Sequence, residues 1–216
     1  DGSCQVNHEG HLIDLRLSTL PISRGESIVC RLLDPRRVKT DWESLGLEAG
    51  TLKDIKDLVS QPYGMFVVSG PLGSGKTTTL YTTLAHLNDG TKKIITVEDP
   101  VEQNLDGIEQ VQVNHSLGLS FAKVVRTILR HDPNVILIGE IRDEETAEIA
   151  CRAALMGRLV LATIHANTAE LVRERFINLG IPPYLIDEVL LGVLSQRLEP
   201  ISCPDCRGSG CSSCKN

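Results

Sequence analysis

Eight consecutive residues of this sequence have the composition of a loop that binds phosphate groups. Residues 70–77 read Gly-Pro-Leu-Gly-Ser-Gly-Lys-Thr and match the pattern G-x-x-x-x-G-K-[ST] at every fixed position. The glycines allow backbone N–H groups to turn inward around an anion at the start of a helix. Lys76 is expected to reach the β- and γ-phosphates of a nucleotide, and the Thr77 hydroxyl to ligate Mg²⁺. The predicted nucleotide-binding residues are Gly70, Pro71, Leu72, Gly73, Ser74, Gly75, Lys76, Thr77 and Thr78.

Acidic residues follow two apolar segments that have the length of buried strands. Glu140 comes after Val-Ile-Leu-Ile-Gly at residues 135–139, and Glu98 lies in Ile-Thr-Val-Glu-Asp-Pro-Val-Glu at residues 95–102. An acid at the carboxyl end of a parallel strand, beside a phosphate loop, faces the ligand crevice. Hydrolysis needs one carboxylate to hold Mg²⁺ and another to orient or deprotonate water, and two strand-end acids fit that division. The alternative is that Glu98, Asp99 and Glu102 are solvated loop residues.

One histidine and five arginines are further candidates. His165 follows an apolar segment at residues 159–164 and could hydrogen-bond a γ-phosphate, although a single histidine in this position is more often structural. An arginine is usually a solvated surface charge, but a ring-shaped ATPase needs arginines that reach into a neighbouring subunit's site. Arg126 and Arg130 are four residues apart and share a helix face. The candidate arginines are Arg16, Arg31, Arg126, Arg130 and Arg142.

Short apolar strands alternate with helices in the segment that must position these residues. The pattern predicts strands at residues 65–69, 93–97, 108–113, 135–138 and 159–164. It predicts helices at residues 51–60, 77–87, 120–129, 143–156, 168–178 and 184–198, with Ser120 as an N-cap. Strands of nearly continuous apolar character separated by helices indicate an α/β fold with a parallel sheet covered on both faces. The first 38 residues are predicted to be rich in β-strands.

The overall composition limits the class of function. The chain has 216 residues, with 22 Lys and Arg against 28 Asp and Glu, so its net charge is −6. An acidic balance and only 3% aromatic residues argue against a protein that coats nucleic acid. No apolar run reaches the ~18 residues that would suggest a membrane span. The sequence begins with Asp1 rather than Met, and we expect it to start inside a larger protein.

Four of the seven cysteines lie in the last 14 residues, in two C-x₂-C pairs. Four thiolates suit a tetrahedral Zn²⁺ ion, and such a site would be structural because all four positions are filled by protein. The alternative is a tail that is disordered or prone to form disulfides. The predicted zinc ligands are Cys203, Cys206, Cys211 and Cys214.

With these motifs in their order along the chain, the sequence resembles the ATPase family of type II secretion and type IV pilus assembly. The resemblance covers nearly the whole chain, and the ordered set of motifs is far more specific than the phosphate loop alone. The matching segments are residues 14–21, 24–33, 69–79, 96–102, 129–134, 139–143, 162–167 and 193–198.

The resemblance implies a RecA-like P-loop ATPase core at residues 63–200, after a linker and helix at residues 35–62. It also implies that residues 1–34 are the last part of a smaller PAS-like domain and that residues 201–216 form a short tetracysteine knuckle. Members of the family assemble as homo-hexamers on the cytoplasmic face of the bacterial inner membrane. They use ATP, Mg²⁺ and a platform protein of the membrane, with its cytoplasmic adaptor, to move pilins or pseudopilins; no nucleic acid is involved.

The resemblance also assigns roles to individual residues. It implies that Glu98 activates the attacking water, that Glu140 acts on Mg²⁺, and that His165 is the retained histidine of the family's histidine box. Arg16 and Arg31 match arginines of the smaller domain that face nucleotide. Arg126, Arg130 and Arg142 match core arginines at subunit and nucleotide contacts.

Two departures from the family pattern stand out. The family usually has Thr-Gly-His before its last catalytic strand, whereas this chain has Met156-Gly157-Arg158, which removes one histidine of the histidine box. The two cysteine pairs are separated by only four residues, Arg207-Gly208-Ser209-Gly210, which is closer than in the family.

Three other functions remain alternatives. A P-loop kinase would need an acceptor pocket and a cluster of lid arginines. A RecA-like nucleic-acid motor is disfavoured by the acidic balance and by the scarcity of aromatic residues. A scaffold that binds nucleotide without hydrolysing it would not need Lys76, Thr77, Glu98 and Glu140 together.

Overall fold

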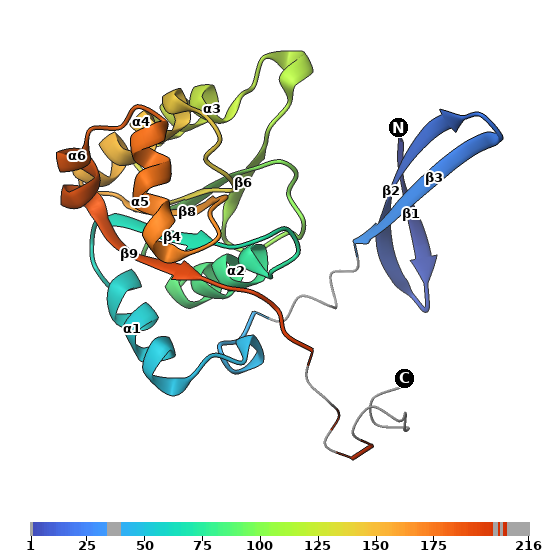
Figure 1. Cartoon of the computed structure of the whole chain (residues 1–216), viewed down its shortest axis with the longest axis horizontal. Coiled ribbons are helices and arrows are strands. Elements are labelled where there is room, and N and C mark those ends of the chain that lie inside the picture. Colours follow the sequence, from blue (N-terminus) through green and yellow to red (C-terminus); the bar gives the residue numbers. More distant parts are fainter. Residues whose placement is uncertain (1, 34–39, 201–202, 204, 207–216) are drawn as a thin grey trace.

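The computed structural model describes residues 2–33, 40–200, 203 and 205–206. These residues form a three-stranded antiparallel sheet, a six-stranded parallel sheet and the helices that cover the larger sheet (Figure 1). None of the described helices combines the length and the hydropathy needed to cross a bilayer.

The six-stranded sheet has the strand order β6-β5-β7-β8-β4-β9, and all its neighbouring strands are parallel. Because the strands run in one direction, their carboxyl ends meet at a single edge, which is where parallel sheets bind ligands. The α/β fold class with a parallel central sheet is therefore confirmed. The strands are β4 (Gly64–Ser69), β5 (Ile94–Glu98), β6 (Glu109–Gln112), β7 (Val135–Ile138), β8 (Leu159–Ile164) and β9 (Leu190–Ser195).

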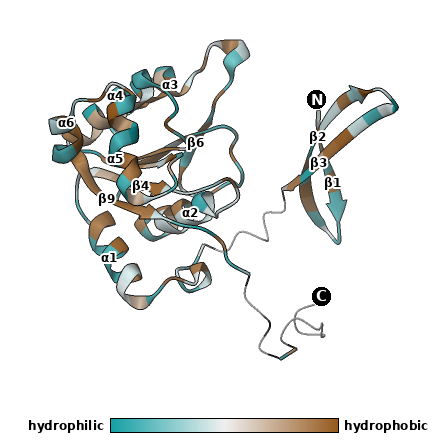
Figure 2. Ribbon diagram, in the orientation of Figure 1, coloured by the Kyte–Doolittle hydropathy of each residue, from teal (hydrophilic) through white to brown (hydrophobic). Residues whose placement is uncertain are grey.

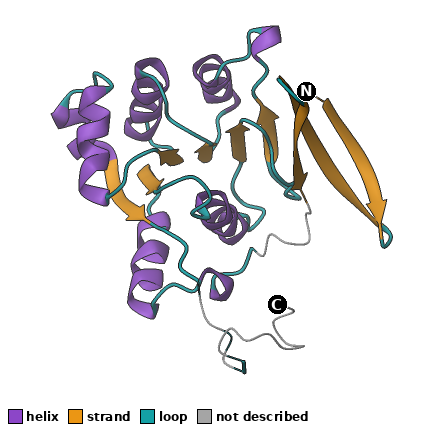
Figure 3. Ribbon diagram, turned by 45° about the vertical axis from the view of Figure 1, so that its right-hand side comes forward, coloured by secondary structure: helices purple, strands orange, loops and turns teal. Residues whose placement is uncertain are grey.

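Successive residues of the inner strands enter two separate cores. In β4, Met65 and Val67 pack with helices α3 to α6, while Phe66 and Val68 pack with α1 and α2 on the other face. Every residue of β4, β5, β7 and β8 is buried, which explains their continuous apolar character. Figure 3 shows helices on both sides of the central strands. The helices are α1 (Ala49–Val59), α2 (Lys76–Leu87), α3 (Phe121–Ile128), α4 (Glu144–Leu155), α5 (Ala169–Asn178) and α6 (Pro183–Val189).

Local signals place the ends of two of these helices. The Ser120 side chain accepts a hydrogen bond from the backbone N–H of Lys123, which confirms the predicted N-cap of α3. Asp143 caps α4 in the same way by accepting from Thr146 N–H. Short 3₁₀ turns lie at Glu43–Leu45, His115–Leu117 and Leu129–His131.

The predicted helix at residues 184–198 is wrong in its second half. Helix α6 ends at Val189, and Leu190–Ser195 forms the edge strand β9 beside β4. The pairing with β4 fixes the strand conformation, and β9 also passes close to α1, since a Cβ atom at Gly192 would lie 2.7 Å from Cδ1 of Leu58. The strand is strongly apolar (Figure 2), and a short leucine-rich run does not by itself distinguish a helix from a buried strand.

The three-stranded sheet consists of β1 (Gly2–His8), β2 (His11–Ile22) and β3 (Gly25–Leu33). Two-residue turns join the strands, and Glu9 and Gly10 of the first turn have φ values of +55° and +82°. The register pairs Arg16 directly with Arg31, so both side chains lie on one face. The other face carries mainly apolar residues such as Leu15 and Leu32.

Candidate functional site

The phosphate loop connects the end of β4 to the start of α2, at the carboxyl edge of the sheet. Gly70, Gly73 and Gly75 have φ values of +141°, +74° and +86°, a region that favours glycine. A Cβ atom at Gly70 would overlap the carbonyl oxygen of Gln196. The loop can therefore adopt this curve only with glycine at its first position.

Two polar groups of the loop suit an anionic ligand. Lys76 Nζ donates hydrogen bonds to the carbonyl oxygens of Gly70, at 2.9 Å, and of Pro71, at 2.8 Å, so its charge is held over the loop. The hydroxyl of Ser74 is buried and has no hydrogen-bond partner among the described residues. Burial lowers the pKa of Lys76, and the negative charge of Glu140 opposes that shift. The loop thus offers a cation and an unsatisfied hydroxyl to a phosphate group.

A cleft of about 680 Å³ lies between this loop, the ends of β5, β7 and β8, and the three-stranded sheet. Its volume is within the range of small-molecule sites, roughly 300–1,000 Å³. The cleft brings together most of the predicted site residues, namely Arg16, Arg31, Leu72, Gly73, Ser74, Gly75, Lys76, Thr77, Thr78, Glu98, Glu140, Arg142 and His165. Gly70 and Pro71 instead line a smaller adjacent pocket.

Glu140 follows β7 and joins two other predicted residues. Its Oε1 lies 2.8 Å from Nε2 of His165, and its Oε2 accepts hydrogen bonds from Nε and Nη2 of Arg142, both at 2.6 Å. The hydrogen bond from Arg142 is also the main reason why the pKa of that arginine is raised. The Glu140 carboxylate is therefore oriented within the cleft by contacts with Arg142 and His165.

Glu98 ends β5 and is only 4% exposed. It accepts hydrogen bonds from the hydroxyl groups of Tyr81 and Thr96, the latter at 2.5 Å, and from Nε2 of Gln110 at 3.2 Å. Burial and the charge of Glu98 raise the pKa of Tyr81, so this phenol stays protonated and donates. Three donors therefore occupy the Glu98 carboxylate from within the protein.

Glu102 lies four residues further on and contacts the phosphate loop directly. The Thr77 hydroxyl donates to Glu102 Oε1 at 3.5 Å, and the backbone N–H of Glu102 donates to the Tyr81 hydroxyl at 3.3 Å. Burial, and then the charge of Glu98, raise the pKa of Glu102, while Thr77, Arg31 and Arg16 oppose that shift. Glu102 was not among the predicted site residues, although its place in the acidic run at residues 98–102 was a signal for it.

The five predicted arginines occupy two regions. Arg16, Arg31 and Arg142 line the cleft. Arg126 is exposed on α3, and Arg130 is exposed in the 3₁₀ turn Leu129–His131 that follows this helix; neither is among the described residues that line the cleft. Arg126 pairs with Glu145 of α4 at 2.5 Å, and Nη1 of Arg130 donates to the carbonyl oxygen of Arg126 at 3.1 Å.

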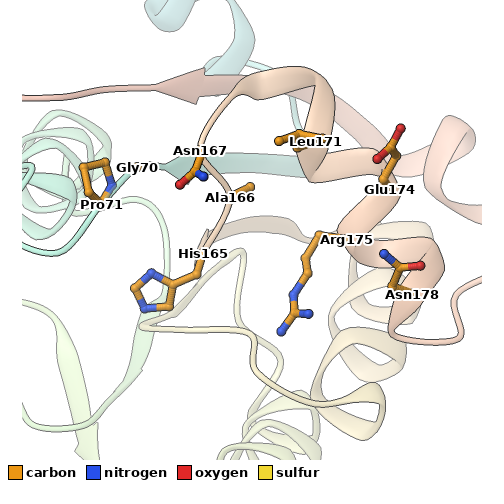
Figure 4. Close-up of a pocket in the computed structure, with 9 residues that line it drawn as sticks. All are labelled: Gly70, Pro71, His165, Ala166, Asn167, Leu171, Glu174, Arg175 and Asn178. Carbon is orange, nitrogen blue, oxygen red and sulfur yellow. The ribbon is translucent and has the colours of Figure 1, made fainter.

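His165 stands between the cleft and the smaller pocket, which has a volume of about 330 Å³ (Figure 4). Asn167, Arg175 and other residues of the segment after β8 and of α5 line the far side of this pocket. Arg158, at the position where the resemblance predicts a histidine, lies directly before β8, about 20 Å from His165 at the usual rise of a strand. Its side chain bonds to Asp132 and to the Met156 carbonyl oxygen, so the replacement does not alter the surroundings of His165.

The cysteine tail is described only in part. Cys203 and Cys206 belong to the described residues, whereas Cys211 and Cys214 lie outside them. Within the described part of the chain, no group of three or more His, Cys, Asp or Glu side chains could hold a metal ion.

Comparison with known sequences assigns the family. The family model for "Type II/IV secretion system protein" matches residues 1–216. Type II secretion system protein HxcR of Pseudomonas aeruginosa is 47% identical over 99% of this chain and 47% of its own length. Type II secretion system ATPase E of Vibrio cholerae is 48% identical over 96% of this chain and 41% of its own length. The chain therefore spans less than half the length of these relatives.

Comparison with solved structures supports the same assignment. The pilus retraction motor PilT, solved with bound ADP, superposes with a TM-score of 0.77 at 32% identity, over 92% of this chain and 59% of PilT. The ATPase DotB of Legionella pneumophila has the same fold, with a TM-score of 0.71 over 87% of this chain and 53% of DotB. The match along the full length and the identity of nearly half to named relatives show that this chain belongs to the family of type II/IV secretion system proteins.

Proposed function

We propose that this chain is the nucleotide-hydrolysing part of a motor that powers type II protein secretion or type IV pilus assembly. The observation that carries the proposal is a single cleft in which the phosphate loop faces Glu140, His165 and Arg142. Relatives named as a secretion ATPase and a retraction motor solved with ADP support ATP as the nucleotide.

In this proposal the phosphate loop binds the triphosphate and Lys76 neutralises its β- and γ-phosphates. Thr77 and Glu140 are the residues that would hold Mg²⁺, because hydroxyl and carboxylate oxygens are its preferred ligands. When bound, the ion neutralises charge that develops on the phosphates. Arg142 and His165 hold Glu140 in place, and His165 also faces the position of the γ-phosphate.

Between the two glutamates of the run at residues 98–102, the geometry favours Glu102 as the group that takes a proton from the attacking water. Both residues line the cleft, but Glu98 is buried and its carboxylate already accepts hydrogen bonds from three internal donors, whereas Glu102 contacts Thr77. Glu98 then acts on Glu102 through Tyr81. The Tyr81 hydroxyl group donates to the Glu98 carboxylate and accepts from the backbone N–H of Glu102. This assigns the base role to Glu102 in place of the Glu98 that the sequence analysis favoured.

We further propose a homo-hexamer at the cytoplasmic face of the inner membrane, docked on a platform protein and its adaptor. Arg126 and Arg130, which are exposed outside the cleft, would then serve contacts between subunits. Residues 1–34 would belong to a PAS-like domain whose Arg16 and Arg31 close the cleft over the nucleotide.

For the tail we propose one structural Zn²⁺ held by Cys203, Cys206, Cys211 and Cys214. The support is the chemistry of four thiols in two C-x₂-C pairs, which is the donor set of tetrahedral zinc sites. Zinc bound at one ion per chain, and lost in Cys203→Ser, is the expected result of elemental analysis.

Two variants test the proposed hydrolysis. Lys76→Ala should lose ATP binding, while Glu140→Ala should retain ATP but release phosphate on the order of 100-fold more slowly, as for loss of a group that stabilises transition-state charge. Phosphate release is measured without any acceptor molecule, so that a kinase, which needs one, gives no signal. Wild-type turnover in both variants would contradict the site.

A further inference from the structure

Gln196, the residue directly after β9, forms hydrogen bonds with the phosphate loop and with the strand and helix on either side of it. Its Nε2 donates to the carbonyl oxygen of Ser74 at 2.6 Å, and its Oε1 accepts from the hydroxyl of Thr79 at 2.8 Å. Its backbone N–H donates to the carbonyl oxygen of Ser69 at 3.0 Å. One residue thus joins the end of β4, the middle of the loop and the first turn of α2.

The phosphate loop packs so closely against Gln196 that side chains at two of its glycines would contact this residue. A Cβ atom at Gly70 would overlap the carbonyl oxygen of Gln196, and a Cβ atom at Gly75 would lie 3.1 Å from Nε2 of Gln196. The amide both donates and accepts, which a carboxylate or an apolar side chain of similar size cannot do. The hydrogen bond to the Ser74 carbonyl restrains the backbone in the middle of the loop, the part whose conformation decides whether its N–H groups can surround an anion.

We propose that Gln196 is a positioning residue of the nucleotide site, which fixes the curve of the phosphate loop from the edge strand β9. This inference rests on the proposed nucleotide binding and adds a residue that is more than 110 positions from the loop in sequence. As a consequence, the affinity for nucleotide should depend on a side chain at position 196 that donates a hydrogen bond to the Ser74 carbonyl oxygen, and not only on a side chain of the right volume.

Two substitutions separate the donor from the packing. Gln196→Glu keeps the shape of the side chain and replaces Nε2 with an oxygen. When the carboxylate is ionised, this oxygen repels the Ser74 carbonyl oxygen; when it is protonated, its O–H can donate to the Ser74 carbonyl oxygen. Gln196→Met keeps the volume and never donates. Arg197→Gln is the matched control, because Arg197 is exposed and pairs with Glu199.

The dissociation constant for ADP is measured by calorimetry at pH 8 and pH 5.5 and divided by the wild-type value at the same pH. At pH 8 both Gln196 variants should bind ADP about tenfold more weakly, as for one lost hydrogen bond to a buried group. At pH 5.5 the deficit of Gln196→Glu should shrink several-fold, while that of Gln196→Met should not change. The melting temperature without nucleotide is recorded for every variant.

A merely structural role predicts a different result, in which both variants lose affinity in step with melting temperature and neither recovers at low pH. That result would overturn the inference, and so would binding within twofold of wild type at pH 8 in either variant. If one variant does not fold at pH 8, the other variant decides by the same criteria. If Lys76→Ala binds ADP as wild type does, the proposed function fails instead, independently of position 196.

Discussion

Glu98 and Glu102 are four residues apart, yet their surroundings give them different chemistry. Both line the cleft, but Glu98 accepts three hydrogen bonds from within the protein, whereas Glu102 contacts the hydroxyl group of Thr77. Tyr81 links them, because it donates to Glu98 and accepts from the backbone of Glu102. At the scale of single residues, the site is thus a buried acid that sets the environment of an accessible one.

The pH dependence of hydrolysis should report Glu102. Its pKa lies above the ordinary glutamate value because of burial and then the charge of Glu98. A base works only when ionised, so activity should be lost as the pH falls through this raised pKa. The acid limb of the pH–rate profile, where the rate falls with falling pH, should therefore lie above about pH 4.5. The rate of phosphate release between pH 4.5 and pH 8 measures it.

Glu102→Gln should lower the rate by roughly 100- to 10,000-fold, the usual contribution of a general base, and should remove the acid limb. Glu98→Gln serves as the comparison, because it should lower the rate while leaving a limb that starts at lower pH. If the limb is unchanged in Glu102→Gln, the base is another group.

At the scale of elements, the site depends on the turn from β4 to α2 and on the edge strand that closes it. Ser69 at the end of β4 accepts the backbone N–H of Gln196, so β9 holds the turn from outside. The pattern of apolar residues predicted β4, β7 and β8 and the helices between them, because buried parallel strands are continuously apolar. It misassigned residues 190–195, because a short leucine-rich run acquires its strand conformation only from pairing with β4.

Gly70→Ala tests how tightly this turn is held. The new methyl group would meet the backbone carbonyl of Gln196, which cannot move without breaking the pairing of β9. The matched control is Gly90→Ala, where φ is +81° and nothing lies within 4 Å, so that only the backbone strain of about 1–2 kcal/mol is expected. Urea unfolding should show a larger loss for Gly70→Ala, together with weaker ADP binding. Equal losses would mean that the contact is not rigid.

At the scale of the whole molecule, the cleft is shared between the parallel core and the three-stranded sheet. Arg16 and Arg31 lie opposite each other in the register of β2 and β3, and both line the cleft with Glu102. Their positive charge lowers the pKa of Glu102 and partly offsets the effect of burial. Two arginines of the three-stranded sheet thereby contribute positive charge to the cleft and lower the pKa of Glu102.

Removing both arginines should change binding and pH dependence together. In Arg16→Ala with Arg31→Ala, the pKa of Glu102 should rise further, so the acid limb of hydrolysis should move to higher pH, and ATP should bind at least several-fold more weakly. Arg24→Ala is the control, because this exposed arginine lies in the turn between the same strands. An unchanged limb in the double variant would show that the small sheet does not act on the cleft.

The sequence by itself determined the phosphate loop, the alternation of buried strands and helices, and the strand-end positions of Glu140 and His165. These features are local, because glycine freedom, apolar periodicity and chain order act over a few residues. Only the tertiary structure decided that Glu98 accepts three internal hydrogen bonds while Glu102 contacts Thr77, and that Gln196 forms hydrogen bonds with the loop. Such facts depend on contacts between segments up to about 120 residues apart, and their energies arise only when the sheet brings those segments to one edge.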